Sequence, residues 1–130
     1  MAIWYLDPSA LAKLVPPETE TQALRRWLSR KPWVVSDLQR TELRRAGGRA
    51  LAHAEWLLAE SDVLRIDADV FDRAARMQPA SLRSLDALHL AAAMNLGPDL
   101  SGIVGYDQRF LHAVLVAGVP TASPGARPSH

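Results

Sequence analysis

The chain alternates short apolar segments with segments of helical periodicity, and this alternation restricts the folds that it can adopt. The candidate strands are residues 2–6, 33–35, 63–66, 102–106 and 119–122. Strands that are apolar on both faces belong to parallel sheets with helices packed on each side. The sequence therefore predicts an α/β fold of three layers, α/β/α, around a central, mostly parallel sheet of four or five strands.

Helical patterns fill the intervals between these strands. The predicted helices are residues 8–15, 18–30, 37–60, 69–77, 85–96 and 108–117, the third of which is disturbed by a Gly-Gly pair. We expect Ser36 and Ser84 to cap the helices that follow them. The predicted domain covers residues 1–122, and residues 123–130, which include two prolines, are predicted to form a mobile tail.

Composition excludes several classes of protein. The chain has no cysteine, so disulfides and thiolate zinc sites are excluded and a reducing cytoplasm is the expected setting. The start of the chain shows no basic leader, and no apolar run is long enough to cross a bilayer, so we expect no membrane association. Thirteen of the fifteen basic residues are arginine, whose paired donors match phosphate oxygens. A GC-rich genome would also enrich arginine, so both explanations remain open.

Two acidic residues stand directly behind predicted strands. Asp7 follows the strand at residues 2–6, and Asp107 follows the strand at residues 102–106. Because the carboxyl ends of parallel strands share one edge, where open α/β sheets bind ligands, we expect these side chains to lie close together. Each residue also precedes a helix and could act as its N-cap. The presence of both at one edge favours a shared site.

Two further acids lie on predicted helices. Asp86 is in the first turn of helix 85–96, which is apolar nearly all round and is therefore predicted to be buried. Glu42 lies at the margin of the apolar stripe of its helix, and taken alone it would be read as solvent-exposed. Clustered, buried carboxylates are costly unless a cation neutralises them. With Asp7 and Asp107, these residues indicate a site for a hard divalent cation, and hence phosphate chemistry.

The sequence around the four acids resembles the PIN-domain ribonucleases, specifically the VapC-type toxins of toxin–antitoxin pairs. The resemblance rests on residues 3–14, 41–43, 84–93 and 105–110, which occur in the family's order, and it extends over residues 2–122. There are two departures. Gly105 stands where family members often carry Ser or Thr, so a hydroxyl near the metal is missing. Pro8 replaces a commoner Thr or small polar residue, and its fixed backbone angle suits the first turn of a helix.

This resemblance implies a PIN-like fold and an endoribonuclease that depends on Mg²⁺ or Mn²⁺ and acts on RNA, structured RNA such as tRNA included. Asp7, Asp86 and Asp107 would bind the ion, Glu42 would bind it directly or through water, and all four would be catalytic. The resemblance further implies a cytoplasmic homodimer inhibited by a cognate VapB-type antitoxin. The alternative is a catalytically weak PIN-like interaction module, metal-poor because of Gly105, that acts through its dimer or antitoxin surfaces.

Several neighbours of the acids have two interpretations. Ser9 either orients a carboxylate or a metal-bound water, or is an ordinary first-turn serine. Arg45 and Arg49 lie near the side of their helix that carries Glu42, where they either hold RNA phosphates or pair with Glu42. His89, one turn after the buried acid of its helix, is expected to be a hydrogen-bonded core histidine rather than a metal ligand.

Overall fold

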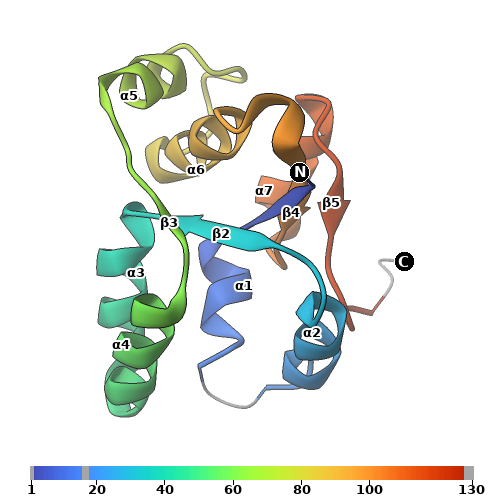
Figure 1. Cartoon of the computed structure of the whole chain (residues 1–130). Coiled ribbons are helices and arrows are strands. Elements are labelled where there is room, and N and C mark those ends of the chain that lie inside the picture. The colour runs from blue at the N-terminus through green and yellow to red at the C-terminus, as the bar shows by residue number, and fades with distance from the viewer. Residues whose placement is uncertain (1, 16–17, 128–130) are drawn as a thin grey trace.

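The computed structural model describes residues 2–15 and 18–127, and of Gly47 and Arg49 it describes the backbone alone. Its centre is a parallel sheet of five strands in the order β3-β2-β1-β4-β5 (Figure 1). The strands are β1 (Ile3–Leu6), β2 (Trp33–Ser36), β3 (Val63–Leu64), β4 (Leu100–Val104) and β5 (Thr121–Ala122). The predicted fold class is confirmed. The third and fifth strands are shorter than the predicted residues 63–66 and 119–122, and the fourth begins and ends two residues before the predicted 102–106.

Seven helices and two short 3-10 turns connect the strands in the described part of the chain. They are α1 (Pro8–Ala12), α2 (Thr21–Leu28), α3 (Leu38–Gly47), η1 (Gly48–Ala50), α4 (Leu51–Glu60), α5 (Ala68–Ala75), α6 (Ser84–Met94), η2 (Gly97–Asp99) and α7 (Gln108–Val116). The single helix predicted over residues 37–60 is two helices, because Gly48 takes a φ of 48° that ends α3. An ion pair of 2.6 Å between Arg44 Nε and Glu55 Oε1 links α3 to α4.

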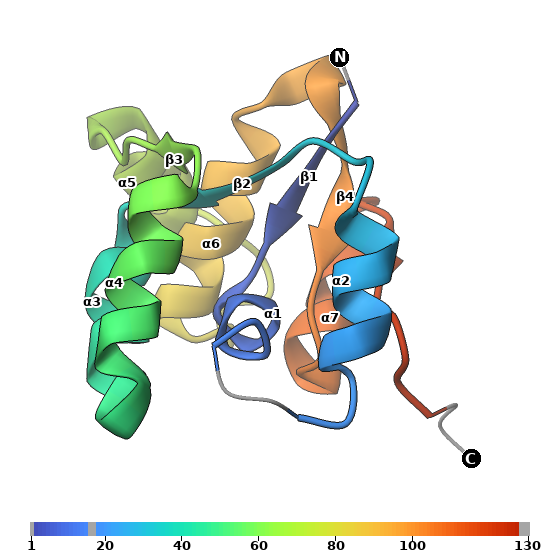
Figure 2. The same cartoon turned by 60° about the horizontal axis from the view of Figure 1, so that its bottom comes forward.

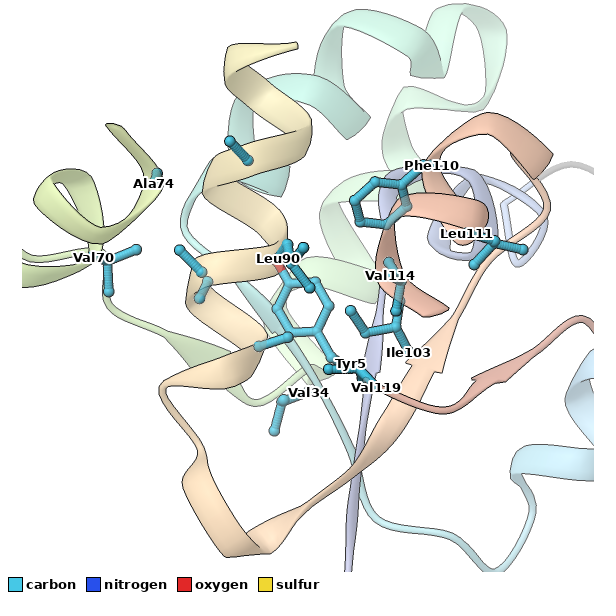
Figure 3. Packing of buried hydrophobic residues seen from close by; sticks show 14 residues of the cluster. Tyr5, Val34, Val70, Ala74, Leu90, Ile103, Phe110, Leu111, Val114 and Val119 are labelled. Carbon is cyan, nitrogen blue, oxygen red and sulfur yellow. The ribbon is translucent and has the colours of Figure 1, made fainter. Parts of the chain in front are cut away.

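Successive residues of the central strands face opposite helical layers. Tyr5 and Ile103 point into a core that they form with α5, α6 and α7 (Figure 3). Their neighbours Leu6 and Val104 point into a second core, formed with α1 to α4. On that second face α1 lies between the α3–α4 pair and α2, as two views of the chain show (Figures 1 and 2). The two cores on either side of the sheet make the three predicted layers.

Both predicted serine caps are wrong. Ser36 ends β2, and its hydroxyl accepts a hydrogen bond from Tyr5 Oη at 2.8 Å, while α3 begins after Asp37 without a side-chain cap. Ser84 is already the first residue of α6, which follows Arg83 and also lacks a side-chain cap bond. In both cases the serine lies one residue away from the position at which its hydroxyl could reach the free N–H groups of the helix.

The segment after β5 continues beside the segment that follows β4, because the two strands are parallel. Tyr106 Oη donates to the Pro124 carbonyl at 2.7 Å, and Ser123 Oγ donates to the Gly105 carbonyl. Residues 128–130 of the predicted tail lie outside the described residues, and the mobility of the tail stays a prediction. Within the described ranges, no helix has the length and hydropathy needed to span a membrane.

The strand order places a reversal of winding between β1 and β4. From β1 the chain adds β2 and β3 on one side, and it then crosses to β4 and β5 on the other. Open α/β sheets bind ligands beyond the carboxyl ends of the strands at such a reversal. Asp7 follows β1, and Asp107 lies three residues beyond the end of β4, so both acids flank this point.

Candidate active site

Four acidic side chains line one cavity of about 500 Å³ at this reversal. Asp7 follows β1, Glu42 comes from α3, Asp86 from the first turn of α6, and Asp107 is the N-cap of α7. The cavity is also lined by Pro8, Ser9, Arg83, Ser84, Leu85 and Phe110. The structure thus brings together all four acids that the sequence singled out, from four separate elements.

Asp7 is the most deeply buried of the four, with 2% of its surface exposed. One carboxylate oxygen, Oδ1, accepts hydrogen bonds from Ser9 Oγ at 2.6 Å and from the Ala10 amide at 2.8 Å, so the residue does cap α1. Burial raises the pKa of Asp7 to about 6, although these two hydrogen bonds act in the opposite direction. The carboxyl is therefore held in place, and its charge is poorly solvated.

Ser9 connects the ends of the two strands. Its hydroxyl donates to Asp7 and accepts from the Tyr106 amide at 2.8 Å, so it joins the residue after β1 to the segment after β4. It is a first-turn residue of α1 and at the same time orients a carboxylate, which combines two of the interpretations that the sequence left open.

Gly105 lies against the Asp7 carboxyl group. A Cβ atom at position 105 would stand 2.6 Å from Asp7 Cγ and 3.0 Å from Oδ1, and still closer to Oδ2. Real Cβ atoms essentially never approach other atoms so closely, and a serine or threonine would displace the carboxyl group. The position of the Asp7 carboxyl group therefore requires glycine at position 105. The hydroxyl group that donates a hydrogen bond to Asp7 comes from Ser9.

Glu42 faces the cavity because a buried histidine holds it. His89, 1% exposed, contacts Glu42 Oε1 through Nε2 at 2.6 Å and Tyr5 Oη through Nδ1 at 2.6 Å. Tyr5 Oη also donates to Ser36 Oγ, so Ser36, Tyr5 and His89 form one buried chain of hydrogen bonds that ends at Glu42. The prediction of a hydrogen-bonded core histidine is confirmed. The sequence did not show that its acidic partner is Glu42 of α3. His89 itself lies on α6, one turn after Asp86.

Asp86 and Asp107 complete the acidic wall. Burial raises the pKa of Asp86, and the charges of Asp107 and Glu42 act in the same direction, against the nearby Arg83 guanidinium. Arg83 Nε lies 3.7 Å from Asp86 Oδ2. Asp107 Oδ1 accepts from the amides of Arg109 and Phe110 at 3.1 and 3.4 Å, so this acid is also a helix cap. Capping and membership of the acidic cavity thus coexist in Asp7 and Asp107.

The donor set suits a hard, hydrated cation. Every titratable acid in the cavity wall is a carboxylate, which is the ligand type of Mg²⁺ and Mn²⁺. Within the described residues, no three Asp, Glu, His or Cys side chains stand close enough to enclose an ion by themselves. Mg²⁺ keeps several of its waters and uses one or two protein carboxylates, so an ion held partly through water fits this wall.

Arg45, one of the two arginines proposed from the sequence, does not line the acidic cavity. Arg45 lines an adjoining cavity that also reaches Glu42 and Phe71, and Glu42 has His89 as its hydrogen-bond partner. The side chain of Arg49 lies outside the described part of the structure. The arginine at the wall of the acidic cavity is Arg83, which sequence analysis missed even though it stands three residues before Asp86.

The structure is that of an α/β/α protein with four acids at the winding reversal of a parallel sheet. Comparison with known proteins shows the family to which such a protein belongs. The PIN domain family model matches residues 4–113, and the chain belongs to the PIN domain family. Within it, the chain belongs to the VapC ribonucleases. Ribonuclease VapC46 of Mycobacterium tuberculosis (strain ATCC 25618 / H37Rv) is 43% identical, with 95% of this chain and 99% of that protein covered.

Other relatives agree with this assignment. Ribonuclease VapC47 of Mycobacterium tuberculosis (strain CDC 1551 / Oshkosh) is 41% identical, with 94% of this chain and 97% of that protein covered. The crystal structure of Mycobacterium tuberculosis VapC20, a toxin that cleaves the sarcin-ricin loop, superimposes with a TM-score of 0.67. The superposition covers 96% of this chain and 99% of the VapC20 chain at 22% sequence identity, and it shows that the two proteins share a fold.

Proposed function

We propose that this protein is a divalent-metal-dependent endoribonuclease that hydrolyses RNA phosphodiester bonds, and the toxin of a VapBC-type pair. The observation that carries the proposal is the convergence of Asp7, Glu42, Asp86 and Asp107 on one cavity wall. Without a cation, burial opposes the ionisation of Asp7, and burial together with the charges of Asp107 and Glu42 opposes the ionisation of Asp86. A divalent ion removes that conflict, and no structural role of the four acids would require such a concentration of charge.

The acids would hold Mg²⁺ or Mn²⁺, Asp7, Asp86 and Asp107 as the main ligands and Glu42 directly or through water. When bound, such an ion acidifies a water molecule and stabilises the negative charge that develops on an attacked phosphodiester. The protein's own groups position these ligands: Ser9 and the Ala10 amide fix Asp7, and His89 fixes Glu42. Outer partners of this kind orient metal ligands and maintain their basicity.

The proposed substrates are RNAs, structured RNA such as tRNA included. The test is to incubate the purified protein with total tRNA in Mg²⁺ and to sequence the new RNA ends. Asp86→Asn should abolish cleavage, as should EDTA, and the matched control Asp72→Asn, at an exposed position of α5, should cleave as the wild type does. Cleavage that survives both EDTA and Asp86→Asn would contradict the proposal.

One observation favours a second candidate, a catalytically weak PIN-like interaction module. In the described part of the chain no three acids are gathered tightly enough to enclose an ion unaided. Such a module would use its surfaces and not its acids. Calorimetric titration with Mn²⁺ separates the two candidates, because the module predicts no binding near millimolar metal and the nuclease predicts a saturable site.

The remaining partners follow from the VapC family and are proposals for this chain. We propose that a cognate VapB-type antitoxin inhibits cleavage and that the protein is a homodimer. We further propose that it acts in the cytoplasm, where the RNA substrates are. Co-expression with the neighbouring open reading frame, followed by light scattering of the purified complex, tests the first two. A monomer that co-purifies with no second protein would contradict both.

A further inference from the structure

A further cavity, distinct from the one that Arg45 lines, adjoins the acidic cavity and shares part of its wall. It encloses about 430 Å³ and has Arg83 and Asp86 in common with the acidic cavity. The lining comprises Gln78, Pro79, Ser81, Leu82, Arg83, Asp86, Arg109, His112, Ala113 and Val116. We call this space the flanking cavity. Its volume lies within the range of roughly 300–1,000 Å³ that small-molecule sites occupy.

We propose that the flanking cavity binds one nucleotide of the RNA next to the phosphate that is cleaved. In this arrangement Arg83 and Arg109 neutralise backbone phosphate, and the apolar wall receives a base. The inference rests on the proposed function, since it takes the acidic cavity to hold the scissile phosphate. It assigns a binding role to a surface that lies beside the acids and outside the proposed metal ligands, apart from the shared Asp86.

The charge of the wall differs between the two cavities. The acidic cavity has four carboxylates and one arginine in its wall, whereas the flanking cavity has two arginines and one carboxylate. Arg83 and Arg109 are exposed, and the 3.7 Å approach of Arg83 to Asp86 is a loose ion pair that leaves most of the guanidinium available. The sign of the charge therefore reverses across the shared edge. A polyanion that reaches the acids through a cation would meet positive charge immediately beside them.

The wall of the flanking cavity combines apolar side chains with hydrogen-bonding groups. Pro79, Leu82, Ala113 and Val116 supply apolar surface, and Gln78 and Ser81 supply hydrogen-bonding groups at its border. Single-stranded RNA is bound by this combination, in which bases rest on apolar or aromatic surface while arginines follow the backbone. A second copy of the chain or an apolar peptide would use the apolar wall but would gain little from two arginines at the edge of an acidic site.

Both arginines lie next to acids of the proposed metal site in the sequence. Arg83 precedes α6, whose first turn carries Asp86, and Arg109 lies two residues after Asp107. Both arginines are therefore attached to the helix starts that position two of the acids. An RNA strand that lies in the acidic cavity can therefore reach both arginines without a further domain or loop of the protein.

Binding of oligouridine labelled with fluorescein, measured by anisotropy in EDTA, tests the inference without cleavage. We expect Arg109→Gln to weaken binding about fivefold at low salt and to lower the slope of log affinity against log salt by about one. The matched control is Arg26→Gln, which removes the same charge from an exposed position of α2, in the opposite helical layer, and should leave the slope unchanged. Equal behaviour of the two variants would overturn the inference.

A second comparison tests the base. An oligomer of abasic ribose phosphates keeps the charge of oligouridine but has no bases, and we expect it to bind about tenfold more weakly. Val116→Ser should reduce this preference, while Leu115→Ser, at the neighbouring exposed position, should not. No preference for bases, or the same preference in both variants, would contradict the assignment. So would a shift from dimer to monomer in Val116→Ser with unchanged RNA binding, because the cavity would then be an interface between copies.

The outcome can be separated from that of the proposed function. If the wild type cleaves RNA and the Arg109 and Val116 variants bind oligouridine like their controls, only the flanking cavity is wrongly assigned. If these variants alter binding as expected but the wild type does not cleave RNA in Mg²⁺, the nuclease assignment fails and the RNA site stands.

Discussion

Asp7 is predicted to lower the stability of the metal-free protein, and the substitution Asp7→Asn measures by how much. The pKa of Asp7 in the folded protein is about 6, against an ordinary value of 3.8, and burial is the largest cause. That difference corresponds to about 3 kcal/mol of folding free energy at neutral pH. Asparagine has nearly the same shape and can accept the hydrogen bonds of Ser9 and Ala10 through Oδ1, but it carries no charge.

The sign of the pH dependence follows from the direction of the shift. Because the folded-state pKa lies above the unfolded one, the folded protein binds more protons than the unfolded chain between about pH 4 and 6. The contribution of Asp7 to stability is therefore greatest below pH 4 and is lost as the pH rises through 6. In EDTA, Asp7→Asn should be more stable than the wild type by up to about 3 kcal/mol at pH 8, and by much less at pH 4.

Urea unfolding at these two pH values, followed by tryptophan fluorescence, measures the difference. Asp72→Asn, exposed on α5, is the control and should be within about 0.5 kcal/mol of the wild type at both. Saturating Mg²⁺ should raise the stability of the wild type and not of Asp7→Asn. The reasoning is refuted if Asp7→Asn is the less stable protein at pH 8, or if its difference from the wild type does not change with pH.

Two further substitutions test the supports of the site. His89→Phe removes the partner of Glu42, so we expect a loss of about 1–3 kcal/mol in stability and a fall of roughly 10–100-fold in RNA cleavage. His89→Gln, which can still donate to Glu42, should recover part of the cleavage, and wild-type rates in both variants would count against a positioning role. Gly105→Ser places a Cβ against the Asp7 carboxyl group and should cost about 1–3 kcal/mol by urea unfolding, with weaker binding of Mn²⁺. Unchanged stability and Mn²⁺ affinity would show that Asp7 moves aside freely.

The sheet and the meeting of the acids were predictable because both follow from local patterns. Apolar strands followed by Asp7 and Asp107 indicate a parallel sheet with acids at one edge, and the structure has this arrangement. Parallel strands end at the same edge of a sheet, so the acids that follow two of them lie close together. The two serine caps failed because a helix start was misjudged by a single residue, and a cap acts only at one position.

The contacts that orient the acids could not be predicted, because they join residues far apart in the chain. Glu42 is held by His89, 47 residues away, and Tyr5 reaches His89 across 84 residues. No local periodicity reports which histidine meets which glutamate. The arginines beside the acids were accessible to sequence reasoning, since Arg83 and Arg109 lie within three residues of Asp86 and Asp107. Their spacing from the acids does not show that both side chains line one cavity.

We propose that Asp7, Glu42, Asp86 and Asp107 form a site for a divalent cation. Titration with Mn²⁺, with free Mn²⁺ followed by electron paramagnetic resonance, tests it independently of any RNA. We predict that the wild type removes Mn²⁺ from solution with a saturable stoichiometry, and that Asp86→Asn weakens this binding at least about tenfold. If the wild type and Asp86→Asn leave the same concentration of free Mn²⁺ throughout the millimolar range, the four acids do not bind the ion and the account is wrong.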